Sequence, residues 1–442
     1  MKAPLPRAEL EDIAARIFRY ATADTTIVSV GSTVTGNTRF AVNELTTVGD
    51  VIDTSVDVEV SFGSKHAGVQ TNDLSDAALQ AAVRRAESLA KLAPEDPETM
   101  PPLGPQTYQD INAYFDSTIV VGAAERAHAI LTALEPARRS GASGFLAAGS
   151  IVTTAASSLL ANTEGLSAYW RETDAGYTLT VRSADGTGSG WSSASEHDWT
   201  RLDAAAVAAR ALDTARRSRK AIPIEPGRYT VILEPEATSD IIELLPLDAR
   251  DADEGRSPFA KPGGGTKLGE PVVDARVTLF ADPADPDLLA QPFDGDGFPM
   301  SRQVWIERGV LRQMQMSRFW AKKQGRPYTG GATSFKFAGG STSREAMIRT
   351  TERGLLITRF WYIVGVDPQT ALHTGLTRDG VFLIEHGEVT TAVKNLRFNE
   401  SPLFVLNNLD ALGPVKRVSD GNTAMPVLKA HDFAFTSLSD AV

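Results

Sequence analysis

The sequence contains no cysteine, and this absence excludes both disulfide bonds and thiolate metal sites. Histidine is also scarce, with only six in 442 residues. No two of these histidines have the spacing that lets one helix face hold a metal ion between two imidazoles. They are His66, His128, His197, His373, His386 and His431. The usual sulfur and nitrogen ligands of zinc are therefore not indicated by any local motif.

The sequence also lacks an excess of positive charge and a long apolar helix. Its 55 acidic and 44 basic residues give a formal charge of −11, which repels phosphate backbones, so no nucleic-acid partner is expected. The uncharged stretch 141–163 is rich in Ser, Thr and Gly and predicts a pair of buried strands, not a bilayer helix. Acidic residues precede any apolar run in residues 1–18, so we expect no secretory signal, no membrane partner and a cytoplasmic location.

The chain reads as two lobes of the α+β class. An N-terminal α/β lobe, residues 1–222, is expected to precede a largely β C-terminal lobe, residues 223–442, that carries one central helix. Closely spaced prolines near 93–107 predict an extended linker. Residues 250–270 are charged and glycine-rich, and we expect a flexible loop because they offer little apolar surface to offset their ordering entropy.

The central helix of the second lobe carries the strongest candidate chemistry. A short apolar strand, Tyr229–Leu233, leads through Pro235 into an amphipathic helix that Pro246 ends or kinks. Glu243 and Asp248 are its candidate metal ligands. Two carboxylates without an imidazole or thiolate suit Mg²⁺ or Ca²⁺ better than zinc. The alternative, which we favour, is a solvated or salt-bridged helix face.

Several segments resemble the TldD/PmbA family, and together they extend over nearly the whole chain. In chain order they are HAGVQTNDLS at 66–75, DAR at 248–250, DEGRS at 253–257, TERGLLITRFWY at 351–362, TGLTRDG at 374–380 and VKNLRFNESP at 393–402. Each segment alone is a weak signal, whereas their shared order and spacing are specific. The sequence is therefore identified as similar to this family.

The resemblance implies a metalloprotease made of two different subunits. In bacterial members the active subunit carries His-Glu-x-x-x-His on the corresponding helix, and a later cysteine completes its zinc site. Aligning the Pro235 turn places Glu243, Leu244 and Asp248 at the positions of that motif, and no histidine lies between His197 and His373. The chain thus resembles the TldE (PmbA) branch, the subunit without the metal site.

This resemblance implies a non-catalytic subunit that pairs with a TldD-like, zinc-bearing subunit to degrade or process unfolded proteins and peptides. No cofactor is expected in this chain, and a homodimer in isolation is left open. Two alternatives also remain open. One is a metallopeptidase that is active by itself through a divergent metal site, and the other is a family member repurposed in a biosynthetic pathway.

Two arginines in the C-terminal lobe are candidates for binding a substrate or partner. Arg359 and Arg378 lie between apolar neighbours in β-rich runs, where charge-assisted bonds could orient a peptide carboxylate. The alternative is that they pair with Glu352 and Asp379 and so fix the lobe.

Three further residues are weaker candidates. His66, near a strand edge, and Arg256 are assigned to substrate or partner contact. His197 stands between Glu196 and Asp198, whose adjacent side chains do not converge on one ion, so a surface loop or a cap before the next helix is expected there.

Overall fold

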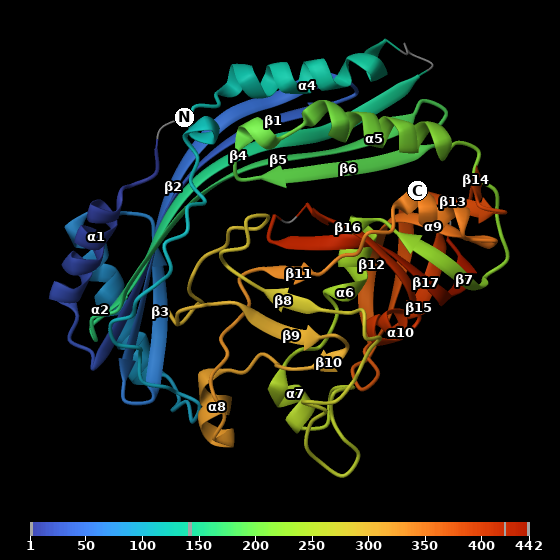
Figure 1. Cartoon of the computed structure of the whole chain (residues 1–442). Helices are drawn as coiled ribbons and strands as arrows, with labels where there is room; N and C mark the ends of the chain where they lie inside the picture. The colour runs from blue at the N-terminus through green and yellow to red at the C-terminus, as the bar shows by residue number, and fades with distance from the viewer. Residues whose placement is uncertain (1–2, 140–143, 420, 440–442) are drawn as a thin grey trace.

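The strands form two separate sheets in the computed structural model, which describes residues 3–139, 144–419 and 421–439. We call the six-stranded sheet and its helices the N-terminal lobe, and the eleven-stranded sheet and its helices the C-terminal lobe. The six-stranded sheet is strongly curved, and the C-terminal lobe lies on its concave side (Figure 1). The predicted α+β class is confirmed.

The N-terminal lobe consists of long antiparallel strands and four principal helices. Its strands are β1 (Thr25–Ala41), β2 (Glu44–Phe62), β3 (Lys65–Thr71), β4 (Phe145–Asn162), β5 (Ser167–Ser183) and β6 (Ser189–Glu196), in the order β3-β2-β1-β4-β5-β6. Its helices are α1 (Arg7–Tyr20), α2 (Asp76–Leu92), the short α3 (Asp116–Ile119), α4 (Ala123–Arg138) and α5 (Ala204–Arg217), with one 3-10 turn, η1 (Trp199–Arg201).

One face of this sheet is covered by all four principal helices. Alternate residues of a strand share a face, so Ile151 and Leu159 of β4 point to the same side. Ile151 packs in the hydrophobic cluster formed with α4 and α5, and Leu159 packs in the cluster formed with α1 and α2. The two helix pairs therefore cover opposite ends of one apolar face, as Figure 1 shows.

The stretch predicted as a pair of strands, residues 141–163, is one strand over its described part. Residues 141–143 lie outside the described residues, and Phe145–Asn162 continues without a turn. The prediction was wrong because alternating burial persists through Gly149. A Cβ at Gly149 would lie 2.1 Å from the Thr178 carbonyl oxygen, so this glycine permits a close approach between β4 and β5 and does not mark a turn.

The C-terminal lobe is largely β, and its helices are all short. Its strands are β7 (Gly227–Leu233), β8 (Leu279–Ala281), β9 (Gln303–Glu307), β10 (Val310–Leu311), β11 (Phe335–Phe337), β12 (Arg353–Asp367), β13 (Leu372–Glu385), β14 (Glu388–Ala392), β15 (Leu396–Glu400), β16 (Leu409–Arg417) and β17 (Thr423–Leu438). Its helices are α6 (Pro235–Ile242), α7 (Ala249–Asp253), α8 (Arg318–Gln324), α9 (Arg344–Arg349) and α10 (Pro402–Asn407).

The core of this lobe lies inside a closed ring of strands. β7 pairs with β12 in parallel and with β17 in antiparallel fashion, so β17, β15, β13, β12 and β7 close on themselves. Phe360, Phe398 and Phe433 fill part of this core, with ring centroids 4.8 Å apart for Phe360 and Phe398. The expected central helix is α6, and four further helices accompany it.

The proline-rich segment 93–107 lies between the lobes without a helix or strand of its own after residue 93. Glu98 forms an ion pair with Arg250 at 3.0 Å, and the Pro101 carbonyl accepts a hydrogen bond from Arg318 at 2.6 Å. The segment therefore contacts the C-terminal lobe. The domain boundary between residues 222 and 223 stays a prediction.

The loop predicted at 250–270 includes α7 and several hydrogen-bonded turns. The Lys267 N–H donates to the Phe259 carbonyl at 2.7 Å, and the Phe259 side chain is buried in the core of the C-terminal lobe. Among the described helices, none is long and apolar enough to cross a membrane.

A buried arginine attaches α4 to the sheet. Arg126 is fully buried and donates to Asp50 at 2.6 Å and to Thr38 at 3.1 Å. Gly36 of β1 leaves the space for its guanidinium group, because a Cβ there would lie 2.1 Å from Nη1. The buried Arg126 can therefore take this position only because residue 36 is a glycine.

We expect Gly36→Ala to destabilise the N-terminal lobe by about 1–3 kcal/mol, because the added methyl group must displace Arg126 from its partners. The measurement is the free energy of unfolding in urea. Gly31→Ala on the same strand is the matched control, since its Cβ would meet only the Ser55 hydroxyl at 3.5 Å. Equal stability of the two variants would contradict the prediction.

Candidate functional site

Helix α6 follows a buried strand directly and carries the positions singled out by the sequence. Pro235 occupies its first turn, where the missing N–H costs nothing. Ala237, Ile241 and Ile242 are buried against the core. The helix ends at Ile242, four residues before Pro246, and the following residues form turns.

The structure does not bring the positions of the aligned metal motif together. Glu243 is the C-cap of α6 and accepts a hydrogen bond from the Ser239 hydroxyl. Asp248 is the N-cap of α7 and accepts from the Asp251 N–H at 3.0 Å, while Leu244 is half-buried. The two carboxylates therefore terminate different helices. Glu243 lines a cavity of about 360 Å³, and Asp248 is not among the residues lining it.

These residues do not fit a zinc ion. Zinc sites in proteins use imidazole and thiolate donors together with carboxylates, and the aligned positions offer two separated carboxylates and a leucine. Within the described residues, no group of three or more His, Cys, Asp or Glu side chains is placed to hold a metal ion. No chemical step is therefore derived through a metal in this chain.

Asp240 is a further acidic residue of α6 that sequence reasoning missed. Its carboxylate accepts a hydrogen bond from the Phe360 N–H at 2.7 Å, which ties α6 to β12. The pKa of Asp240 is raised to about 7, chiefly by burial. The Phe360 hydrogen bond and the charge of Arg359 lower the pKa, whereas the charges of Glu236 and Glu243 raise it, and the value is the net result. An aspartate directly before the apolar pair Ile241 and Ile242 in a short helix was the only available signal.

Arg359 and Arg378 converge on a buried aspartate. Asp379, whose side chain is only 5% exposed, lies 3.8 Å from Arg359 and 3.7 Å from Arg378. It also accepts a hydrogen bond from the Ser189 hydroxyl of β6 at 2.6 Å. The alternative that Asp379 pairs with these arginines is thus observed. The expected pairing with Glu352 was wrong, because Glu352 lies beside His386 on the surface.

Aromatic rings extend this contact across both lobes. The Arg359 guanidinium lies 4.2 Å from the Trp191 ring of β6 and 5.0 Å from the Trp361 ring of β12. Arg378 lies 5.0 Å from the same Trp361 ring. We call Asp379, the two arginines, Ser189 and Trp191 the interlobe clasp. Its interactions occupy both arginines and join β6 to the hairpin of β12 and β13.

His197 is buried between the lobes, so the prediction of a surface loop was wrong. Its Nδ1 lies 2.7 Å from the Thr173 carbonyl oxygen, and its Nε2 lies 2.9 Å from that of Leu288. Arg417 of β16 also approaches Nε2, at 3.2 Å. The sequence places this histidine after a strand end, where it reads as exposed, and only the packing of the second lobe covers it.

The remaining predicted binding residues lie apart from this region. His66 is the second residue of β3, with Nδ1 4.0 Å from the Asp96 carboxylate. Arg256 follows α7 and pairs with Asp251 at 2.6 Å and with Glu254. These two residues belong to different lobes, and the structure does not bring them together with Arg359 or Arg378.

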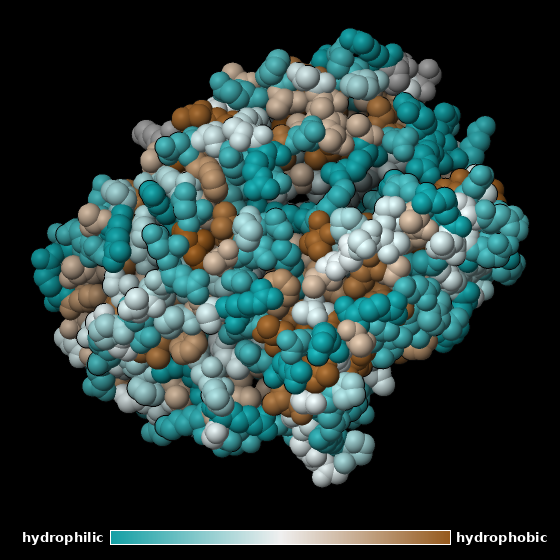
Figure 2. Space-filling view, viewed as in Figure 1, coloured by the Kyte–Doolittle hydropathy of each residue, from teal (hydrophilic) through white to brown (hydrophobic). Residues whose placement is uncertain are grey.

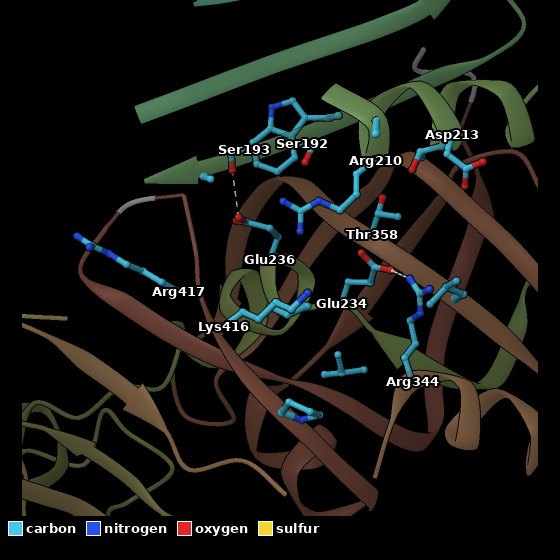
Figure 3. Close-up of a pocket in the computed structure, with 18 of the residues that line it drawn as sticks. Ser192, Ser193, Arg210, Asp213, Glu234, Glu236, Arg344, Thr358, Lys416 and Arg417 are labelled. Atoms are coloured by element: carbon cyan, nitrogen blue, oxygen red, sulfur yellow. Dashed lines mark hydrogen bonds and ion pairs between the residues drawn. The ribbon is translucent and has the colours of Figure 1, made fainter. Parts of the chain in front are cut away.

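A cavity of about 900 Å³ lies between the lobes and is a candidate binding site. Its walls come from β6 and α5 on one side and from α6, β12, β13 and β16 on the other (Figure 3). Glu236 of α6 links the two lobes by accepting a hydrogen bond from the Ser193 hydroxyl of β6 at 3.2 Å. Within its own lobe, Glu236 also accepts a hydrogen bond from the Ser419 N–H at 3.0 Å. Such an interlobe cavity is a common location for ligand binding.

We expect Asp240→Asn to stabilise the protein above neutral pH. The folded chain retains the Asp240 proton up to about pH 7, whereas the unfolded chain loses it near the ordinary value of 3.8. The free energy of unfolding therefore falls as the pH rises between these values, and this loss is complete above about pH 7. The asparagine variant avoids it and should gain about 2 kcal/mol or more near pH 8.

Denaturant titrations from about pH 4 to pH 8 measure this effect, and the gain should shrink toward acidic pH. Asp110→Asn, at an exposed position, is the control for removing one negative charge. A constant difference between Asp240→Asn and the parent across this range would show that the proton on Asp240 is not responsible.

Two domain models of one family match the chain. The PmbA/TldA metallopeptidase central domain matches residues 113–219, and the PmbA/TldA metallopeptidase C-terminal domain matches residues 226–437. Together these matches cover the elements on both sides of the interlobe cavity.

Relatives of known name are metalloproteases from archaea. The chain is 26% identical over 294 residues to a metalloprotease of Methanothermobacter thermautotrophicus, covering 64% of this chain and 61% of that protein. It is 27% identical over 165 residues to a metalloprotease of Archaeoglobus fulgidus, covering 37% of this chain and 35% of that protein. The chain thus spans less than two thirds of either relative.

Solved structures share the fold over nearly the whole chain. TldE from Thermococcus kodakarensis superimposes with a TM-score of 0.85 at 17% identity, covering 96% of this chain and 99% of that chain. A candidate modulator of a DNA gyrase from Thermotoga maritima gives 0.84 at 20% identity, covering 96% and 100%. The domain matches and the shared fold agree with the resemblance in the sequence, and the chain belongs to the PmbA/TldD family of metallopeptidase-like proteins.

Proposed function

We propose that this chain is the TldE-like, non-catalytic subunit of a metalloprotease made of two different subunits. Its partner is a TldD-like subunit that supplies the zinc ion, and the substrates are unfolded proteins and peptides. The chain itself contributes fold, subunit contacts and part of the wall that encloses the substrate.

This proposal rests on the structural role of the residues that align with the metal motif. Glu243 and Asp248 cap two different helices, and both already accept hydrogen bonds from their own helices. A carboxylate engaged as a helix cap serves the backbone or a neighbouring side chain. The family's metallopeptidase domain is therefore retained here while these positions serve local structure, which supports a role beside a metal-bearing subunit.

A surface strip suits contact with a partner subunit. The free end of the β12–β13 hairpin exposes Trp361, Tyr362, Val364 and Val366, with Tyr362 73% exposed. Elsewhere the visible face is mostly hydrophilic, with apolar residues in small patches (Figure 2). A strip with Trp and Tyr has the composition of the energetically dominant residues of protein interfaces. Strand β2 also exposes Val51 and Ile52, but no aromatic residue accompanies them in its exposed part.

We expect the purified chain to bind no zinc tightly and to cleave no disordered peptide alone. Mixed with a TldD-like subunit that carries His-Glu-x-x-x-His, it should support chelator-sensitive cleavage. Elemental analysis after dialysis without chelator and a peptide cleavage assay measure both outcomes. The control is a complex in which alanine replaces the motif histidines of the TldD-like subunit, because this complex should assemble but not cleave the peptide.

Two results would contradict the proposal. The first is one zinc per chain that is lost in the Glu243→Ala, Asp248→Ala double variant. The second is robust, chelator-sensitive cleavage by this chain in the absence of a partner.

We expect Val364→Lys with Val366→Lys to weaken the two-subunit complex about tenfold or more, because charges replace exposed apolar contacts at an interface. Sedimentation or titration calorimetry with the partner measures the affinity. Val120→Lys, at an isolated exposed valine, is the control. Unchanged affinity in the double variant would exclude the hairpin strip as the subunit contact.

A further inference from the structure

Two cations in the interlobe cavity have no partner among the residues that the structure describes. Arg210 projects from α5 and Lys416 from β16, so they come from opposite lobes. Figure 3 shows both side chains directed into the pocket from facing walls. Neither side chain makes a hydrogen bond, an ion pair or a ring contact within the described part of the chain.

The other cations of this cavity are each paired with an acid. The nitrogen-to-oxygen distances are 3.6 Å for Arg201 and Glu196, 3.6 Å for Arg217 and Asp213, 2.7 Å for Arg344 and Glu234, and 3.9 Å for Arg417 and Asp174. The remaining acids are also engaged, since Asp287 pairs with Lys336 at 2.9 Å and Glu236 accepts hydrogen bonds from Ser193 and Ser419. Glu345 also pairs with Arg344, at 3.0 Å. The lining holds six cations and six acids and is neutral overall, so Arg210 and Lys416 are surplus only locally, in that neither has an acidic partner among the described residues.

The surroundings favour separate carboxylates over a phosphate group. The start of α6 is the natural place for a phosphate, but Glu234 and Glu236 flank it and Pro235 has no N–H to offer. The two surplus cations instead stand on facing walls, where each suits one negative charge. The lining also includes the edges of three buried apolar side chains, Leu356, Phe382 and Val427.

We propose that the interlobe cavity binds an acidic, extended peptide segment, with Arg210 and Lys416 each holding a side-chain carboxylate. The inference rests on the proposed function in that it takes the substrate to be a peptide, and it assigns that peptide a charge preference. Because the two cations belong to different lobes, the segment also bridges the lobes. Charge-assisted hydrogen bonds to guanidinium and ammonium groups supply the selectivity.

The test uses the full chain and two fluorescent, unstructured peptides of Gly, Ser and either Glu or Gln. Fluorescence anisotropy at low and at physiological ionic strength gives the dissociation constants. We expect the Glu peptide to bind more tightly, with an advantage that decreases as salt is added. Arg210→Gln and Lys416→Gln should each weaken it about threefold, and the double variant about tenfold.

Matched controls separate a local effect from net charge. Arg85→Gln with Lys322→Gln removes the same two charges from exposed positions on α2 and α8, away from the cavity lining, and should leave binding unchanged. Since Arg210 and Lys416 are exposed and unpaired with described residues, the thermal midpoint of their variants should match that of the parent. Equal loss of binding in the control pair would overturn the proposal.

Further outcomes test the inference separately from the proposed function. Equal affinity for the Glu and Gln peptides would overturn the inference, and so would displacement by inorganic phosphate at lower concentration than by glutarate. If a complex with a TldD-like subunit still cleaves the Gln peptide in those cases, the proposed function stands alone. If Glu-dependent binding persists while no complex cleaves any peptide, the binding site stands and the proposed function fails.

Discussion

The arrangement of the two lobes depends on the interlobe clasp around Asp379. This buried carboxylate is shared by two arginines of its own lobe and by the Ser189 hydroxyl of the other. A buried charge is tolerated only when its hydrogen-bonding and charge requirements are met, and removing one member of such a group exposes the others to the full desolvation cost. Stacking of Trp191 on Arg359 adds apolar contact to the same junction.

Helix α6 is attached to this junction by two acidic residues. Asp240 accepts from the backbone of β12 one residue beyond Arg359, and Glu236 reaches across to Ser193 of β6. Hydrogen bonds from this one short helix therefore fix β12 and β6, which line opposite sides of the interlobe cavity, relative to each other. Arg210 and Lys416 line the same cavity without an acidic partner among the described residues.

The same helix shows how a metalloprotease motif position can be reused. With α6 ending at Ile242 and α7 beginning at Ala249, the aligned positions become a C-cap and an N-cap. The Asp248 carboxylate satisfies an unpaired backbone N–H at the start of α7, and the Glu243 carboxylate accepts from the Ser239 hydroxyl, so each has a structural role without a metal. Ligands arranged along one helix face require an uninterrupted helix, and Pro246 prevents one.

The sequence by itself carried the family resemblance, through the order and spacing of several segments. It also determined the α+β class, the strand leading into α6 and the absence of thiolate ligands, because these depend on composition and local periodicity. It could not separate one strand of 18 residues from two, since alternation is the same in both. It also missed that His197 is buried and that Asp240 bonds to β12. Only the tertiary structure decided these, and the pairing of Asp379 across the lobes, because each depends on residues far apart in the chain: those around His197 and Asp379 meet where the lobes contact each other, and Asp240 and Phe360 meet inside the C-terminal lobe.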